Sequence, residues 1–279
     1  MGINKKANLL LSTQTSSAFS RRSGFTIVET VLFLAISGAL IIALIAGAGV
    51  TLSDQRYRDA TQSFKALLQQ QYSELGSVQN TRTNTWSCNS DALVTSGGDE
   101  EYRGQSECML IGKYLRIQGK DITIYPVLAY EIDTTTIPPT DIEGLRTKYA
   151  LNASTTEIEK DELDWQTEIA WAASGADYNA GGPTPRSLGI LFIRSPDSGQ
   201  VYTFTSDDIP AVDAVNQATF TQLLIAGNSV PGQAARTLCI KSGGLAVSGD
   251  RAVAIAAYAS APSAIEVRSN DLVGNPSQC

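Results

Sequence analysis

Glu29 is the only charged residue between Ser23 and Leu52, and it stands near the start of a long apolar run. From Thr30 to Leu52 the sequence has 23 residues without a charge, rich in Leu, Ile, Val and Ala. An unpaired charge in an apolar environment is costly, whereas a charge paired with an opposite one costs much less. The position of Glu29 therefore predicts a carboxylate that either reaches the lipid headgroups or pairs with a cation.

The apolar run that follows Glu29 is long enough to cross a membrane. About 20 predominantly apolar residues span the hydrocarbon core of a bilayer, and this run lacks the polar face expected of a helix in a soluble core. The preceding residues 1–24 contain no acid, and their four bases form two pairs, Lys5-Lys6 and Arg21-Arg22. Because positive charge before an apolar span stays in the cytoplasm, we expect a single span with the rest of the chain outside.

The stretch "RRSGFTIVE", from Arg21 to Glu29, resembles the processing site of type IV prepilins and of type II secretion pseudopilins. The shared motif is a Gly-Phe junction behind a basic leader, a Glu at the fifth position after the junction, and an uninterrupted apolar run. The resemblance covers about residues 21–52. It implies that a prepilin peptidase cuts between Gly24 and Phe25, that the amine of Phe25 is N-methylated, and that the apolar segment is retained.

The resemblance also implies a role for Glu29 in assembly. Processing creates a cationic amine at Phe25, and the Glu29 carboxylate would pair with the amine of a neighbouring subunit or of its own chain. A wrong longitudinal register would leave two charges unpaired, so the pair would serve register and recruitment more than stability. Subunits that associate head to tail without closing form an open helix. The implied partners are the prepilin peptidase, other pilin subunits, the pilus assembly platform and the membrane.

Other interpretations of the N-terminus stay open. Ala46-Gly47-Ala48 could be the cleavage site of an ordinary secretory signal, although that order does not account for Gly24, Phe25 and Glu29 together. The letters "SRRSGF" also resemble a twin-arginine export signal, but two residues separate the Arg pair from the Phe, and no Lys follows. The domain boundaries expected from the prepilin resemblance are a cleaved leader at 1–24 and a transmembrane or filament-core helix at 25–52.

The segments beyond the membrane predict an α+β fold, in which the long helix packs on a mostly antiparallel β-sheet head. Residues 53–80 continue the helix, because apolar residues recur every three or four positions, and Gly76 or the Asn80 region suits the end. That apolar face contains Tyr57, Ala60, Phe64, Leu67, Leu68, Tyr72 and Leu75. In the head, residues 81–279, alternating runs and turn residues predict hairpins at 108–132 and 187–206 and three strands within 236–269. The resemblance of the N-terminus to prepilins implies the same architecture, because pilin heads consist of a sheet packed on the long helix.

An acidic insertion at about residues 131–178 interrupts the predicted strands. Eleven acids and three bases lie between Glu131 and Asp177. Within this segment, residues 155–175 predict a helix that starts with a capping box of Thr156 and Glu159 and ends at Gly175. The apolar face of this helix would contain Ile158, Trp165, Ile169 and Ala172. The helix would either cover one face of the sheet or meet another subunit or an extracellular target.

Four cysteines agree with an exported head. Cys88, Cys108, Cys239 and Cys279 allow three connectivities, and we favour Cys88–Cys108 with Cys239–Cys279 because each pair flanks its own local block. Loops of that size stabilise a fold by about 3–4 kcal/mol in the chain-entropy model. A metal site is disfavoured, because the chain has no Cys-x-x-Cys spacing and no histidine.

Composition argues against catalysis and against nucleic-acid binding by the head. Without histidine, Ser-His and Cys-His arrangements are impossible, and the sequence has no Gly-x-Ser-x-Gly or phosphate-loop motif. The net charge is −7, and without the leader it is −11, from 17 bases and 28 acids. The nearest basic group, Lys113, Arg116 and Lys120, is small for a nucleic-acid surface. We therefore expect no cofactor and no enzymatic activity.

The sequence favours a minor pilin or pseudopilin, a structural subunit of a type IV pilus-like filament. It would first lie in the cytoplasmic membrane of a bacterial cell envelope with its head outside, and then in a periplasmic or extracellular filament. A single-span or secreted extracellular binding protein is the alternative, and a membrane-tethered hydrolase is a third. Whether the filament would serve adhesion, motility, DNA uptake or protein secretion stays open.

Overall fold

The computed structural model describes a long helix and two main antiparallel sheets, so the α+β class is confirmed. The chain divides into two compact units, Met1–Ala48 and Gly49–Cys279, and each is described by itself. The structure describes residues 24, 26–76, 86–96, 106–135, 137–171, 184–185, 187–206, 220, 224, 233, 235–245, 249 and 251–269.

Helix α1 extends from Ile27 to Gly76. Gly76 is one of the two ends expected from the sequence, and the other, near Asn80, lies outside the described residues. The part of α1 within the second unit is amphipathic, and the buried residues there follow the expected spacing of three or four. They are Tyr57, Ala60, Thr61, Phe64, Leu68, Gln71, Tyr72 and Leu75.

The first main sheet has the strand order β10-β9-β3-β4-β5, with β6 paired to the remaining part of β4. Both predicted hairpins are present, β3–β4 and β9–β10, and the first turns at Gly119, whose φ of +62° favours glycine. The strands are β3 (Cys108–Gln118), β4 (Asp121–Glu131), β5 (Tyr149–Ala153), β6 (Glu159–Glu162), β9 (Ser187–Arg194) and β10 (Val201–Ser206).

The second main sheet has the strand order β13-β12-β11-β7-β8. Its last three strands in the sequence are the three predicted within residues 236–269, and they pair as antiparallel neighbours. The strands are β7 (Glu168–Trp171), β8 (Thr184–Pro185), β11 (Arg236–Lys241), β12 (Arg251–Ile255) and β13 (Ile265–Ser269). A small separate hairpin joins β1 (Trp86–Cys88) to β2 (Val94–Ser96).

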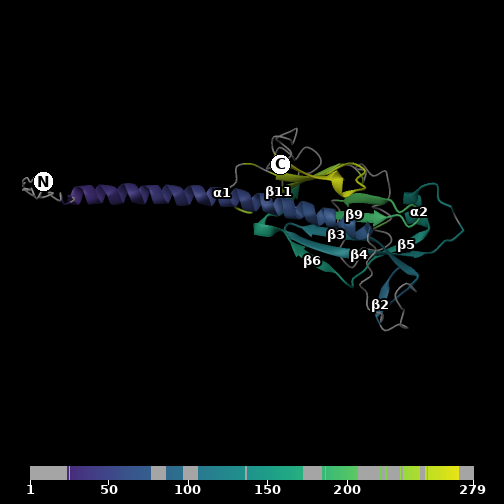
Figure 1. Ribbon diagram of the computed structural model, residues 1–279. Helices are drawn as coiled ribbons and strands as arrows, with labels where there is room; N and C mark the ends of the chain where they lie inside the picture. The colour runs from purple at the N-terminus through teal and green to yellow at the C-terminus, as the bar shows by residue number, and fades with distance from the viewer. Residues whose placement is uncertain are drawn as a thin grey trace, which may run out of the picture. The chain divides into compact units, whose positions relative to one another are not determined.

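The main hydrophobic core places the second part of α1 between the two sheets (Figure 1). Tyr57, Phe64 and Leu68 of α1 pack in one cluster with side chains from β3, β4 and β9 and with others from β11 and β12. A second cluster covers the opposite face of the first sheet. Strand β9 shows the alternation, because Ile190 belongs to the first cluster and Leu191 to the second.

The helix predicted over residues 155–175 is wrong. Strand β6 pairs with β4 there, a 3₁₀ turn follows at Asp164–Gln166, and β7 pairs with β11. The Thr156 N–H donates to Ser154 Oγ at 3.2 Å, and Glu159 begins β6, so no capping box forms. Pairing to neighbouring strands outweighs the helix propensity of the acidic stretch, and the four exposed residues of β6, three of them acids, suit a strand at the side of a sheet.

The expected apolar face of that helix is also wrong. Ile169 lies in the core between the sheets, whereas Ile158 packs against the second cluster. Trp165 is 49% exposed, and Ala172 and Gly175 lie outside the described residues. Among its described residues, the acidic segment contains the helix α2, Asp141–Thr147, in which the Glu143 N–H donates to the capping Thr140 side chain at 3.2 Å.

Candidate functional site on the N-terminal helix

Helix α1 begins directly after the predicted processing junction. Thr26 Oγ1 accepts a hydrogen bond from the Glu29 N–H at 3.3 Å, and the Thr26 carbonyl accepts one from the Thr30 N–H at 3.1 Å. Thr26 is therefore the N-cap residue, and Glu29 is the third helical residue in a Thr-x-x-Glu capping pattern. Gly24 is exposed, with no atom within 4 Å of where a Cβ would lie. Phe25 lies outside the described residues.

Glu29 is exposed at the positive end of the α1 dipole. A carboxylate in this position is stabilised by the unpaired backbone N–H groups of the first turn. In a capping box, the residue at this position can also reach back to the backbone of the N-cap residue, and Phe25 directly precedes that residue. Pairing of Glu29 with the Phe25 amine, in the same chain or between chains, stays a prediction.

The first part of α1 presents apolar side chains around its whole surface. Every large hydrophobic residue from Ile27 to Leu52 is at least half exposed. The exposed fraction ranges from 51% at Val50 and Leu52 to 82% at Ile27. Soluble proteins rarely expose contiguous apolar patches larger than a few hundred Å². By length and composition, α1 is able to cross a membrane.

The second part of α1 is fixed to the head by polar contacts as well as by the core. The Tyr57 hydroxyl donates to the Ile240 carbonyl and accepts from the Arg251 N–H at 2.9 Å. Near the other end, the Tyr72 hydroxyl lies 2.6 Å from Thr203 Oγ1. Burial raises the pKa of Tyr72, against a smaller opposite effect of this hydrogen bond. These contacts bind α1 to strands of both sheets.

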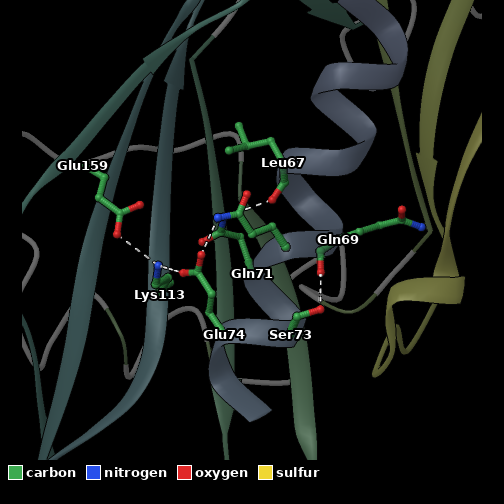
Figure 2. A network of polar contacts seen from close by, with 8 residues as sticks. Leu67, Gln69, Gln71, Ser73, Glu74, Lys113 and Glu159 are labelled. Atoms are coloured by element: carbon green, nitrogen blue, oxygen red, sulfur yellow. Dashed lines mark hydrogen bonds and ion pairs between the residues drawn. The ribbon is translucent and has the colours of Figure 1, made fainter. Parts of the chain in front are cut away.

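Lys113 is a buried cation that joins α1 to the acidic segment (Figure 2). Its Nζ pairs with Glu74 Oε2 on α1 and with Glu159 Oε1 on β6, the second at 3.2 Å. Gln70 donates a further hydrogen bond to Glu74. Burial acts to raise the pKa of Glu74, but the hydrogen bonds from Lys113 and Gln70 outweigh it, and the pKa lies below its usual value.

The basic group of Lys113, Arg116 and Lys120 is largely neutralised within the head. Lys113 is buried between two carboxylates, and Lys120 Nζ pairs with Glu162 Oε1 at 2.5 Å. Arg116 is partly buried. Phosphate recognition needs accessible cations, and Lys113 is not accessible, since it is only 7% exposed.

Near α2, a second set of carboxylates forms hydrogen bonds and ion pairs within the head. Asp141 Oδ2 accepts from the Tyr202 hydroxyl at 2.9 Å, and Lys148 Nζ lies 3.1 Å from both Asp197 and Glu131. Burial and the hydrogen bond to Asp141 raise the pKa of Tyr202 to about 12. Asp141 and Lys148 of the insertion therefore contact Tyr202 and Asp197, which lie outside it. Across the described ranges, no group of His, Cys, Asp and Glu is arranged to hold a metal ion.

The structure joins Cys88 to Cys108, with 6.0 Å between their Cα atoms, which is the pairing favoured from the sequence. Cys239 is also disulfide-bonded. Its predicted partner, Cys279, lies outside the described residues. Each joined or predicted pair lies in the head, in the part of the chain expected to face an oxidising compartment.

The sequence patterns used above did not predict two features of the structure, the cap of α1 and the burial of Lys113. The pattern Thr26-x-x-Glu29 is itself a capping-box signature, and it could have located the start of α1. The burial of Lys113 had no comparable signature, because its partner Glu74 is 39 positions away in the sequence.

The comparisons with known proteins add no relative to these observations. The chain matches no protein-family model, no curated protein and no solved structure. The candidate site therefore rests on the residues of this chain: the Gly24–Phe25 junction, the capping residue Thr26, the carboxylate of Glu29 and the apolar surface that follows.

Proposed function

We propose that this chain is a minor pilin or pseudopilin, a structural subunit of a type IV pilus-like filament. One observation supports this most: the single helix α1 contains both an apolar part with exposed side chains and an amphipathic part built into the head core. Because the amphipathic part belongs to the folded head, retention of the apolar part would give every subunit a hydrophobic segment for packing against other subunits.

We propose that the protein passes from the membrane to the filament in two stages. It first spans the cytoplasmic membrane once, with the head outside, and a prepilin peptidase removes residues 1–24. Its apolar helix then leaves the lipid and packs among the same helices of other subunits at the assembly platform. Repeated head-to-tail contacts of this kind do not close on themselves and so extend a filament.

Glu29 is proposed to set the register of that packing. Processing places a cationic amine at Phe25, next to the cap of α1, and Glu29 is the only acid between Ser23 and Leu52. Once lipid or neighbouring helices surround this region, an amine without an anionic partner is strongly disfavoured. The exposed Glu29 carboxylate is available to an incoming subunit.

Replacement of Glu29 by Gln tests this function. Breaking a buried charge pair costs about 3–5 kcal/mol, so we expect incorporation into filaments to fall on the order of a hundred-fold or more. Processing and the fold of the head should not change. The measurement is the amount of processed protein in sheared filaments relative to the membrane fraction.

Asp59→Asn is the matched control, because it removes one negative charge from an exposed position in the second part of the same helix. Incorporation of Asp59→Asn should equal that of the wild type. Normal incorporation of processed Glu29→Gln would exclude the pairing mechanism, and loss of both variants would show a general effect of charge.

A further inference from the structure

Trp165 is held on the surface by an unusual turn. It is 49% exposed, and both Trp165 and Gln166 have left-handed backbones, with φ values of 57° and 58°. This conformation costs free energy in residues other than glycine. It therefore persists only where the surrounding structure enforces it. Gly243, also with positive φ, packs so closely on the carbonyl of Gln166 that a Cβ would collide with it. The turn therefore has a fixed shape.

Arg56 of α1 lies over the ring of Trp165, with its guanidinium carbon 4.6 Å from the ring centroid. Neighbouring contacts fix this part of α1, because the Tyr57 hydroxyl bonds to the Ile240 carbonyl and to the Arg251 N–H. An exposed cation–π pair of this type contributes about 0.5–1 kcal/mol. The pair therefore places a positive charge directly over an amphipathic aromatic ring.

The position of Arg56 along α1 indicates which layer of a membrane would surround it and the neighbouring Trp165. Arg56 follows Leu52, the last residue of the uncharged run, by four residues, which is about 6 Å along a helix. A run of 23 residues is about 34 Å long as a helix, slightly more than the roughly 30 Å of a hydrocarbon core. A helix that spans the bilayer with this run places Arg56 in the headgroup layer.

We propose that Trp165 and Arg56 form an anchor in the phospholipid headgroup layer of the outer leaflet before assembly. This inference rests on the proposed function, since it needs α1 to span the membrane. Tryptophan favours this layer because its ring is apolar and its indole N–H seeks a polar partner. The guanidinium of Arg56 binds lipid phosphate in the same layer. The anchor sets the depth of the head while the subunit waits in the membrane.

The continuity of α1 favours lipid over a second copy of the chain as the partner. Arg56 lies about one helical turn past the end of the apolar run, so in the membrane this surface meets headgroups at any protein concentration. Close to Arg56, Asp54 is paired with Arg58 at 2.8 Å, which reduces the negative charge that would oppose lipid phosphate.

Depth-dependent fluorescence quenching tests the anchor. The full chain with Trp86→Phe and Trp171→Phe retains Trp165 as its only tryptophan, and it is reconstituted in phosphatidylcholine–phosphatidylglycerol vesicles. We expect strong quenching by lipids labelled at the headgroup or upper acyl chain and weak quenching by lipids labelled near the chain end. Arg56→Gln should reduce the headgroup quenching.

Tyr258 offers a matched control, because it is an exposed aromatic residue, 72% accessible, with a similar φ of 54°. It follows the end of β12 opposite to Arg251, the residue that contacts Tyr57. A chain with Tyr258→Trp and all three native tryptophans replaced by Phe should show no lipid quenching.

Flotation of the vesicles separates the two levels of the proposal. Protein that does not float with lipid would contradict the membrane span and the anchor together. Protein that floats, with Trp165 quenched no more than the Tyr258→Trp control, would overturn the anchor alone. Shielding of Trp165 that appears only at high protein-to-lipid ratios would assign this surface to a second copy and would also overturn the anchor.

Discussion

The two parts of α1 share one backbone geometry and differ in almost every other respect. Between Ile27 and Leu52 the large apolar side chains are at least half exposed, whereas Tyr57, Phe64 and Leu68 are at most 1% exposed. The first part is apolar on all sides and the second on one face only. The hydrogen-bonded helix is therefore common to both, while the side-chain pattern decides whether it needs lipid and other helices or a sheet of its own chain.

The acids of the two parts differ in the same way. Glu29 is exposed at the start of α1, while Glu74 near its end pairs with the buried Lys113. The partner of Glu74 belongs to the same chain, so this pair contributes to the stability of the head. Glu29 is proposed to obtain its partner from assembly, so its loss should affect the filament and leave the head unchanged.

The largest expected difference between the two parts comes from equal truncations. Leu68→Ala removes a side chain with no exposure from the core and should lower the free energy of unfolding of the head by about 2–5 kcal/mol. Leu40→Ala removes the same atoms from a side chain that is 60% exposed, and we expect a change of less than about 0.5 kcal/mol. Urea unfolding in detergent, followed by near-ultraviolet circular dichroism, gives both values. Equal effects of the two substitutions would contradict the separation of roles.

Loss of the Lys113 ammonium should have a smaller effect than Leu68→Ala. Lys113→Met keeps the length of the side chain but leaves Glu74 without its cation, at a cost of about 1–3 kcal/mol in the free energy of unfolding. The Glu74 side chain is 33% exposed, so water will offset part of the loss. The double variant Lys113→Met with Glu74→Gln should recover stability, because the carboxylate that still lacks Lys113 is Glu159, whose side chain is 57% exposed to water. A double variant less stable than Lys113→Met would show that the pair acts differently.

The smallest expected effect is the acid dependence of the head. Since the pKa of Glu74 is lowered in the fold, the folded state binds its proton less tightly than the unfolded state does. The stabilisation is thus present above the unfolded pKa, about 4.3 for Glu, and is lost as the pH falls through the folded pKa. Glu74→Gln should reduce the slope of unfolding free energy against pH in this range. Identical slopes for the two proteins would contradict the assignment.

The sequence predicted the elements in which local pattern and tertiary environment agree. The hairpin β3–β4 and the hairpin β9–β10 have alternating apolar residues on each side of a turn that contains glycine, so period and turn chemistry indicate the same structure. The amphipathic part of α1 was predicted for a similar reason. Seven positions at helical spacing were expected on one face, and Leu67 is the one that is only partly buried.

The acidic segment was mispredicted because its local pattern and its final environment disagree. Glu159–Glu162 has high helix propensity, but the backbone of β4 offers these residues a hydrogen-bonding edge, and the pairing prevails. The contacts of Lys113 with Glu74 and of Arg56 with Trp165 depend on residues far apart in the sequence. No short-range spacing indicates such pairs, so they became visible only with the fold.

The mass of the exported protein shows whether α1 is kept whole after processing. We expect a mature chain that begins at Phe25 and carries one added methyl group on its amine, as seen by intact mass and by mapping of the N-terminal peptide. A mature chain that begins at Gly49, after Ala46-Gly47-Ala48, would contradict this expectation, because the apolar part of α1 would then have served only as a secretory signal.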